Sequence, residues 1–153
     1  MLTFWSLPHN KVDMDIKTID KDLLNELLQK ALKSERHRYA YDLRNSPEDT
    51  SQRMLNTLLP DTEVPIHRHE DTNETILCFF GRIDVVFFEE TTETGKHVIR
   101  DGGRRFVEVG RYNLYPEGER FGVQIPKGVW HSVEPVFPSC IIEVKDGKYV
   151  EKK

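Results

Sequence analysis

The chain has 153 residues, and 22 Lys and Arg against 26 Asp and Glu give it a net charge of −4 at pH 7. That length suits a single domain with a sizeable core, and 37% hydrophobic with 31% charged residues is typical of a soluble globular protein. The acidic balance disfavours a nucleic-acid partner, which needs a basic face, and no apolar run approaches the roughly 20 residues of a membrane span.

The N-terminus and the cysteines indicate the compartment. Residues 1–8 lack the basic start and the long apolar core of a secretory signal peptide. Both cysteines, Cys78 and Cys140, lie in apolar, strand-like runs, where buried free thiols are the default in a reducing compartment. We therefore expect a cytoplasmic protein without a disulfide framework and without a membrane partner.

The first 50 residues predict an arm followed by a helical segment. Residues 1–15 show no clear period, and the apolar side chains that this arm can pack against the domain or a partner subunit are Phe4, Trp5 and Leu7. Within residues 16–50, Asp20 can cap a helix. The residues that then recur at helical spacing on one stripe are Leu23, Leu24, Leu27, Leu28, Ala31 and Leu32. We expect this amphipathic helix to cover the barrel, because its polar face mixes acidic and basic side chains and does not suit a membrane surface.

From residue 51 to 148 the chain has the pattern of β-strands separated by turns. Residues 46–49 before it, Ser-Pro-Glu-Asp, have the cap, proline and acidic residues of a brief helix. The expected strands are 52–59, 75–80, 83–88, 97–99, 104–109, 112–115, 121–125, 129–136 and 140–144. Short strands at this spacing predict a sandwich or barrel, and the lack of helical crossovers disfavours a parallel α/β sheet. Residues 149–153 are expected to form a C-terminal tail.

The stretch from His67 to Gly81 carries the clearest chemistry. His67 and His69 are two residues apart, which places both imidazoles on the same face of an extended strand. Glu74 follows five residues later, so that the chain can turn and bring a carboxylate back towards them. An apolar run over residues 75–80 then ends at Gly81. His-x-His alone occurs often by chance, but this combination is typical of a metal site.

A second segment supplies one more imidazole. Pro126, Gly128 and His131 form a Pro-x-Gly-x-x-His pattern whose histidine lies fifty residues after Gly81. Imidazole and carboxylate are good ligands for Zn, Fe, Ni or Mn. The sequence therefore predicts one divalent metal ion, of undetermined identity, whose ligands are His67, His69, Glu74 and His131.

Together the two segments resemble the paired motifs of the cupin superfamily. The resemblance implies a mainly β, cupin-type double-stranded β-helix, or jelly-roll barrel, over residues 51–148, with the amphipathic helix preceding it. Gln52 to Asn56, Pro65-x-His67-x-His69 and Pro126-x-Gly128-x-Trp130-His131 also resemble the WbuC-type cupin-fold metalloproteins, over residues 16–148.

The resemblance to the WbuC type implies a metal-binding enzyme or accessory protein that acts on a sugar in bacterial surface-polysaccharide (O-antigen or capsule) synthesis. A metal-dependent sugar isomerase or epimerase is the leading hypothesis for its function. A non-catalytic module that binds a small ligand and an Fe(II)-dependent dioxygenase are the alternatives. Cupins of this size commonly pair through sheet edges, which are a liability when left open, so we expect a homodimer.

The ligand is expected to be a small molecule, such as a sugar or a sugar nucleotide. Alternation along the strands predicts that Ile76, Cys78 and Phe80 face the barrel interior with Glu74, and that Val133 does so with His131. Polar contacts must then come from the mouth of the barrel. The candidate substrate-binding residues there are Gln52, Arg53, Tyr112 and Gln124.

Overall fold

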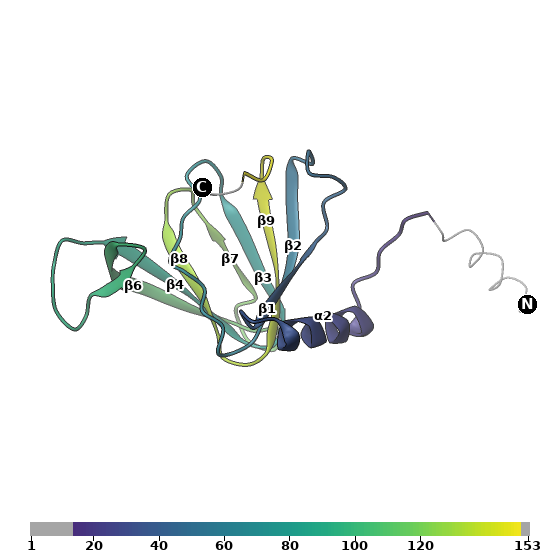
Figure 1. Cartoon of the computed structure of the whole chain (residues 1–153), viewed down its shortest axis with the longest axis horizontal. Helices are drawn as coiled ribbons and strands as arrows, with labels where there is room; N and C mark the ends of the chain where they lie inside the picture. The colour runs from purple at the N-terminus through teal and green to yellow at the C-terminus, as the bar shows by residue number, and fades with distance from the viewer. Residues whose placement is uncertain (1–13, 151–153) are drawn as a thin grey trace, which may run out of the picture.

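The computed structural model describes residues 14–150 and folds them mainly into two antiparallel sheets that pack face to face (Figure 1). Its elements are α2 (Lys21–Lys33), β1 (Arg38–Asp42), β2 (Ser51–Leu58), β3 (Glu74–Phe80), β4 (Ile83–Glu90), β5 (Ile99–Asp101), β6 (Arg104–Leu114), β7 (Gly122–Ile125), β8 (Trp130–Pro135) and β9 (Ser139–Asp146). The prediction of a mainly β protein is confirmed, and the curled antiparallel sheets are consistent with a cupin barrel.

The strand order brings together segments that are far apart in the sequence. One sheet has the order β1-β2-β9-β3-β7 and the other has the order β5-β6-β4-β8. The last strand, β9, pairs with β2 on one side and with β3 on the other. Such pairing of late strands with early ones is typical of a jelly roll, and it places β9 beside β3, the strand that follows the histidine segment.

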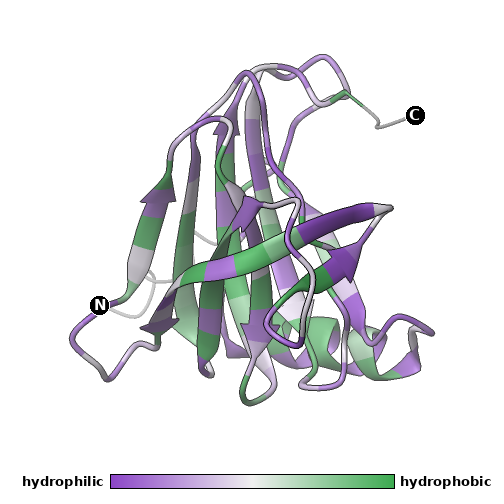
Figure 2. Cartoon of the chain, turned by 90° about the vertical axis from the view of Figure 1, so that its left-hand side faces the viewer, coloured by the Kyte–Doolittle hydropathy of each residue, from purple (hydrophilic) through white to green (hydrophobic). Residues whose placement is uncertain are grey.

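The core lies between the inner faces of the two sheets. Side chains alternate between apolar and polar along most strands, which Figure 2 shows as changes of colour along each ribbon. The buried residues that meet between the sheets are Leu58, Ile76, Cys78, Ile83, Val85, Leu114, Ile125, Val133 and Ile141. This set includes Val133, so the prediction that Val133 faces inward is confirmed.

Strand β3 follows the predicted alternation for most of its length. Ile76 and Cys78 are buried in the core, as predicted, and Leu77 between them is 46% exposed. The prediction for Phe80 is wrong, because this side chain is 47% exposed. A register shift against β9 falls between Cys78 and Phe80, and one extra residue in a strand reverses the face of every side chain after it.

Helix α2 packs on the outer face of the five-stranded sheet. Asp20 accepts a hydrogen bond from the Leu23 amide at 2.9 Å and caps the helix. Leu27 is fully buried against Leu55 and Cys140 of the sheet. No helix within residues 14–150 is long and apolar enough to cross a membrane.

The region before the barrel differs in two places from its prediction. Residues 46–49 form a turn, closed by a hydrogen bond of 3.1 Å from the Asp49 amide to the Ser46 carbonyl oxygen, and not a brief helix. Strand β2 begins at Ser51 and leaves no room for a second turn. The arm predicted for residues 1–15, with Phe4, Trp5 and Leu7, lies outside the described residues apart from its last two positions.

Strand β6 is longer than predicted. Two strands were expected, over residues 104–109 and 112–115, but β6 runs without a break from Arg104 to Leu114. Its pairing with β4 shifts between Phe87 and Phe88, which oppose Gly110 and Glu108, so that Val109 is an extra residue. A glycine within a strand often marks such a bulge, and here it does not end the strand.

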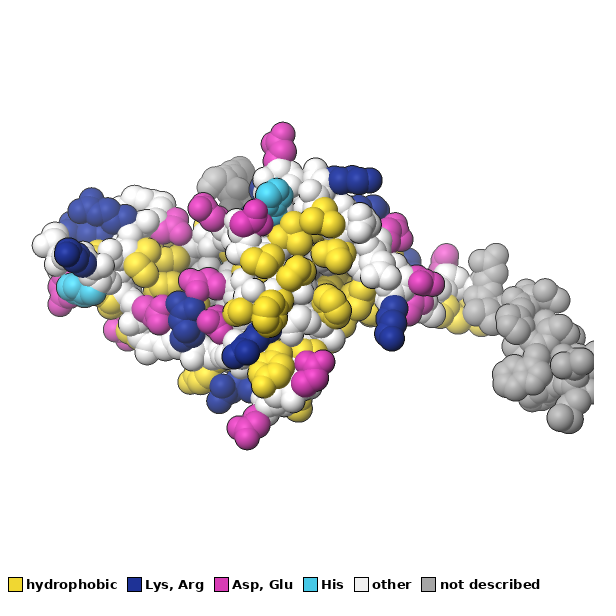
Figure 3. All heavy atoms as spheres, turned by 90° about the horizontal axis from the view of Figure 1, so that it is seen from below, with side chains coloured by type: hydrophobic (Ala, Val, Ile, Leu, Met, Phe, Trp, Pro, Cys, Tyr) yellow, Lys and Arg dark blue, Asp and Glu magenta, His cyan; other side chains and the backbone are white. Residues whose placement is uncertain are grey.

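Hydrophobic side chains gather on the underside of the barrel, where Figure 3 shows a broad apolar area. Phe80 at the end of β3 is 47% exposed, and Val136 and Phe137, in the turn between β8 and β9, are 43% and 56% exposed. Phe121, before β7, is 55% exposed and its carbonyl oxygen accepts a hydrogen bond from the Cys78 amide. Contiguous apolar surface of this kind favours an interface.

Candidate metal centre

Backbone pairing brings the two histidine segments together. His67 and His69 lie in the irregular chain before β3, Glu74 is the first residue of β3, and His131 is the second residue of β8. The amide of His67 donates to the carbonyl oxygen of His131 at 2.9 Å, and the amide of His131 donates back at 2.8 Å. This isolated bridge fixes the loop against β8.

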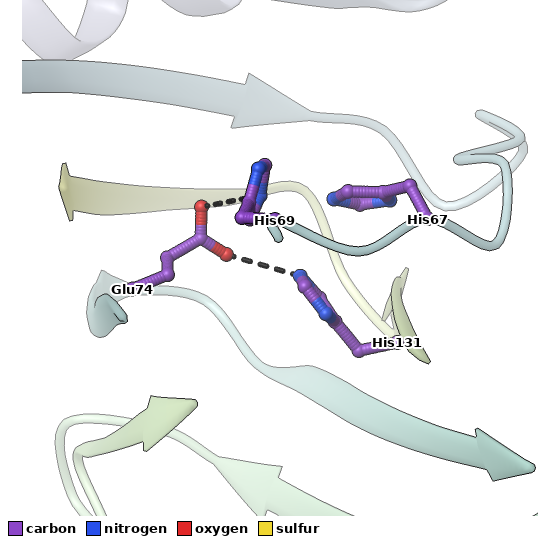
Figure 4. A group of neighbouring side chains, drawn as sticks. All are labelled: His67, His69, Glu74 and His131. Carbon is purple, nitrogen blue, oxygen red and sulfur yellow. Dashed lines mark hydrogen bonds and ion pairs between the residues drawn. The ribbon is translucent and has the colours of Figure 1, made fainter. Parts of the chain in front are cut away.

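The side chains of the four predicted ligands converge (Figure 4). One nitrogen or oxygen atom from each of His67, His69, Glu74 and His131 lies within 4.8 Å of the others. The Glu74 carboxylate lies 3.1 Å from His131 Nε2 through Oε1 and 3.2 Å from His69 Nε2 through Oε2. Glu74 and His131 are buried, with only 2% and 1% of their surfaces exposed.

Backbone carbonyl groups select the tautomer of two of the imidazoles. His67 Nδ1 donates to the Pro65 carbonyl oxygen at 2.8 Å, and His131 Nδ1 donates to the Val129 carbonyl oxygen at 2.9 Å. A carbonyl oxygen only accepts, so the proton of each neutral ring is on Nδ1 and the lone pair is on Nε2. This arrangement is how proteins orient metal-binding histidines.

The geometry around Glu74 requires a cation. In its neutral form His131 presents the Nε2 lone pair to a carboxylate oxygen 3.1 Å away, and two acceptors cannot hydrogen-bond to each other. His69 Nε2 is also buried, and despite its 3.2 Å distance to the carboxylate it has no well-aligned hydrogen-bond partner. A proton on His131, or a metal ion held by all four donors, resolves this contact. The donor set therefore fits a divalent metal.

The titration of the ligands suits that role. Burial and the neighbouring His131 lower the pKa of His67 to about 4, so the ring is neutral near pH 7 and can bind a metal. Burial alone would raise the pKa of Glu74, but the close contacts with the His131 and His69 rings and the charge of Lys145 outweigh it and hold this pKa well below its ordinary value. Glu74 is thus ionised, as a metal ligand must be.

Two charged residues of the site were missed at the sequence level. Lys145 and Glu143 lie on the inner face of β9, in register with Glu74 and Ile76 of β3. Lys145 Nζ is 3.4 Å from Glu74 Oε2. Burial and the charge of Glu74 raise the pKa of Glu143 to about 7, although the residue as a whole is only half-buried. Glu143 and Lys145 follow the buried Ile141 at intervals of two residues, and this alternation was the signal in the sequence that they share its inward face.

A pocket of about 890 Å³ opens beside the metal ligands. His67, His69 and Lys145, which lie at or beside the metal-ligand cluster, form the part of the pocket that we call its floor, and residues 146–150 also line it. Its lining residues are Gln52, His67, Arg68, His69, Glu70, Asp71, Thr72, Lys145, Asp146, Gly147, Lys148, Tyr149 and Val150. This volume lies within the range of small-molecule binding sites.

The structure brings only one of the four candidate substrate contacts to this pocket. Gln52 lines it and donates from Nε2 to the Gly147 carbonyl oxygen at 2.9 Å. Arg53 points to the opposite face of β2 and pairs with Asp49 at 3.1 Å. Gln124 is exposed on the outer face of β7, in a separate pocket of about 390 Å³.

Tyr112 also lies away from the large pocket. It is 45% exposed and contacts the ring of Phe87, with the Arg120 guanidinium 4.9 Å from the centre of its own ring. A direct role in ligand binding for Arg53, Tyr112 or Gln124 therefore stays a prediction.

Comparisons with known proteins identify a family and a fold. Residues 19–99 match the model of DUF6016, a domain of unknown function. No curated protein sequence matches the chain. Among solved structures, an oxalate oxidase is similar at 13% identity and a TM-score of 0.53, over 90% of this chain and 71% of that one. The cupin domain of Schizosaccharomyces pombe Cnp3 is similar at 10% identity and a TM-score of 0.50, over 74% of this chain and 66% of that one.

A further neighbour shows how little the fold says about chemistry. Peruvianin-I, described as a cysteine peptidase from Thevetia peruviana latex, is similar at 10% identity and a TM-score of 0.52, over 90% of this chain and 86% of that one. Identities this low show a shared cupin fold and nothing more. Since one fold supports many activities, function has to be argued from the site.

Proposed function

Because the chain belongs to the DUF6016 family, a domain of unknown function, we propose its function from the site: a divalent-metal-dependent enzyme that acts on a small sugar. The observation that carries this proposal is the Glu74 carboxylate held between the Nε2 atoms of His69 and His131, at 3.2 and 3.1 Å, beside an open pocket. A purely structural metal site is closed by its protein ligands, whereas a site that opens on a pocket can accept a substrate.

Four residues would bind the metal ion, and backbone carbonyl groups next to them orient the imidazoles. His67, His69, His131 and Glu74 would hold the ion, which can be Zn, Fe, Ni or Mn. When bound, such an ion supplies Lewis-acid polarisation of a carbonyl or hydroxyl oxygen. The tautomers fixed by Pro65 and Val129 keep the imidazoles oriented without further reorganisation.

Glu143 favours catalysis over passive binding. Glu143 lies on the inner face of the five-stranded sheet, where it pairs with Ile76, two residues after Glu74 on β3. The pKa of its carboxyl group is about 7. In the metal-free protein, a carboxyl group with this pKa can both accept and donate a proton near neutral pH. Isomerisation or epimerisation of a sugar through an enediol requires a proton to leave one carbon atom and return to the same or a neighbouring one, so these are the reaction classes we propose.

We also propose a biological setting for this activity. The segments Gln52 to Asn56, Pro65-x-His67-x-His69 and Pro126-x-Gly128-x-Trp130-His131 support a WbuC-type protein that serves bacterial surface-polysaccharide (O-antigen or capsule) synthesis in the cytoplasm. The substrate would then be a free sugar or a sugar carried on a nucleotide.

A homodimer is part of this proposal. The apolar underside around Phe80, Val136 and Phe137 and the edge strand β7 support it, because open edges and apolar surface favour association. We expect light scattering after size-exclusion chromatography to give twice the mass of the 18.0 kDa chain at micromolar concentration. A monomer mass over a wide range of concentrations would remove the dimer and leave the metal site untouched.

The experiment that tests the proposed function starts with elemental analysis of the purified protein. Metal-loaded protein is then incubated with aldoses, ketoses and sugar nucleotides, and products are followed by NMR in deuterated water. We expect deuterium to enter one carbon-bound position of a sugar, and metal-free protein to be inactive. Binding without turnover would indicate a ligand-binding module instead, and oxygen consumption that requires Fe(II) would indicate a dioxygenase.

A further inference from the structure

The inner face of β9 places one lysine at the floor of the pocket, next to the metal ligands. Lys145 lies between Glu74 of β3 and Gln52 of β2 in the sheet register. Its side chain is only 18% exposed, and Nζ lies 3.4 Å from Glu74 Oε2. A lysine is rarely enclosed in this way without an anionic partner.

A divalent ion in the cluster would leave this region with too much positive charge. The ion and Lys145 together carry three positive charges, while Glu74 supplies one negative charge. Glu143 reduces the excess when it is ionised but does not remove it. In a pocket partly shielded from water, such an excess favours an anionic ligand.

The rim of the pocket, in contrast, carries more negative than positive charges. Its charged residues are Arg68, Lys148, Glu70, Asp71 and Asp146. Arg68 pairs with Glu70 at 2.9 Å and Lys148 pairs with Glu48 at 2.7 Å, so the positive charges of the rim are already compensated. A ligand with one negative charge that reaches the floor suits this distribution, whereas a diphosphate at the rim would meet Asp71 and Asp146.

We infer that Lys145 binds a carboxylate of the ligand, and that the pocket takes a sugar acid or a similar hydroxy acid. The inference rests on the proposed metal-dependent function and narrows its substrate class. Lys145 Nζ is in contact with an oxygen of a metal ligand, so one small group can reach both the metal and the lysine. A hydroxyl and a carboxylate on adjacent carbon atoms have this spacing, and a neutral sugar leaves the ammonium group without a partner.

The test compares acidic and neutral probes of the same shape on Co(II)-loaded protein. The matched pairs are D-galacturonate with D-galactose and glycolate with ethylene glycol, and the readouts are the visible spectrum of the cobalt and calorimetric titration. We expect wild-type protein to bind each acid at least tenfold more tightly than its neutral partner. Lys145→Met should abolish this preference, and Lys145→Arg, which keeps the charge, should retain most of it.

A matched control removes a lysine–glutamate pair elsewhere. Lys30→Met breaks the 3.3 Å pair with Glu26 on the surface of α2 and should leave both the metal content and the preference for acids unchanged. If Lys145→Met loses its metal, Lys145 serves to position Glu74 and the inference is wrong. Equal affinity of wild-type protein for acid and neutral probes also refutes it, while the proposed sugar function stands. Metal-loaded protein that binds no probe and turns over no sugar contradicts both.

Discussion

Replacing His67 and His69 together by alanine is expected to remove nearly all of the bound metal while the barrel stays folded. The two substitutions delete half of the donor atoms, and loss of even a residue that supports a metal ligand typically costs about 10- to 100-fold in affinity. We therefore expect at least about a hundredfold weaker binding. Both side chains belong to the loop before β3, outside the buried core, and the bridge between His67 and His131 uses only backbone atoms.

The measurement is the metal-to-protein ratio by elemental analysis, together with the circular dichroism spectrum and thermal unfolding. His97→Ala is the matched control, because His97 is an exposed histidine that pairs with the Glu93 carboxylate at 2.9 Å outside the cluster. The control should keep its metal. Full occupancy in the double variant, with a native spectrum, would show that the ion binds elsewhere.

The four ligands could be predicted from sequence because their spacing is local and their chemistry is specific. His67 and His69 lie within seven residues of Glu74, and the Pro-x-Gly-x-x-His pattern marks His131 independently. What brings the two segments together is the backbone bridge between His67 and His131. No local pattern shows that bridge, and only the match of both motifs to one family suggested it.

The pocket residues were harder to predict, because a residue's face depends on register and on irregularities. Gln52 and Arg53 are neighbours on one strand, so only one of them can face the interior, and the structure places Gln52 there. Phe80 turns outward because of a bulge that the sequence of β3 does not reveal. Lys145 and Glu143 resemble a solvated strand end until the pairing of β9 between β2 and β3 is known.

Removing the charge of Glu143 is expected to stabilise the metal-free protein above pH 7. Burial and the charge of Glu74 raise the pKa of Glu143 to about 7 from its ordinary value of 4.5. Between these values the folded chain holds a proton that the unfolded chain has lost, so the free energy of unfolding falls as pH rises, and the full cost is present above pH 7. Glu143→Gln removes that cost, which we expect to raise the free energy of unfolding by about 3 kcal/mol at pH 8.

His67 changes the free energy of unfolding with pH in the opposite direction, over a pH range that overlaps that of Glu143. Its pKa is lowered to about 4 from 6.5, chiefly by burial. Between pH 6.5 and 4, His67 is therefore protonated in the unfolded chain but not in the folded chain. The free energy of unfolding falls as the pH drops through this range. In wild-type protein the two slopes oppose each other between pH 4.5 and 6.5. Without Glu143 the slope of His67 is left, at about 1.4 kcal/mol per pH unit.

Urea unfolding of chelator-treated protein at pH 5, 6, 7 and 8 measures both effects. We expect a nearly flat profile for wild-type protein between pH 5 and 6, and a clear rise with pH for Glu143→Gln. Glu89→Gln, at an exposed position on β4, is the control and should follow the wild-type profile. If Glu143→Gln is less stable than wild-type protein at pH 8, the carboxylate of Glu143 is stabilised by its cationic neighbours Lys145 and Arg38, and the cost of its burial does not dominate.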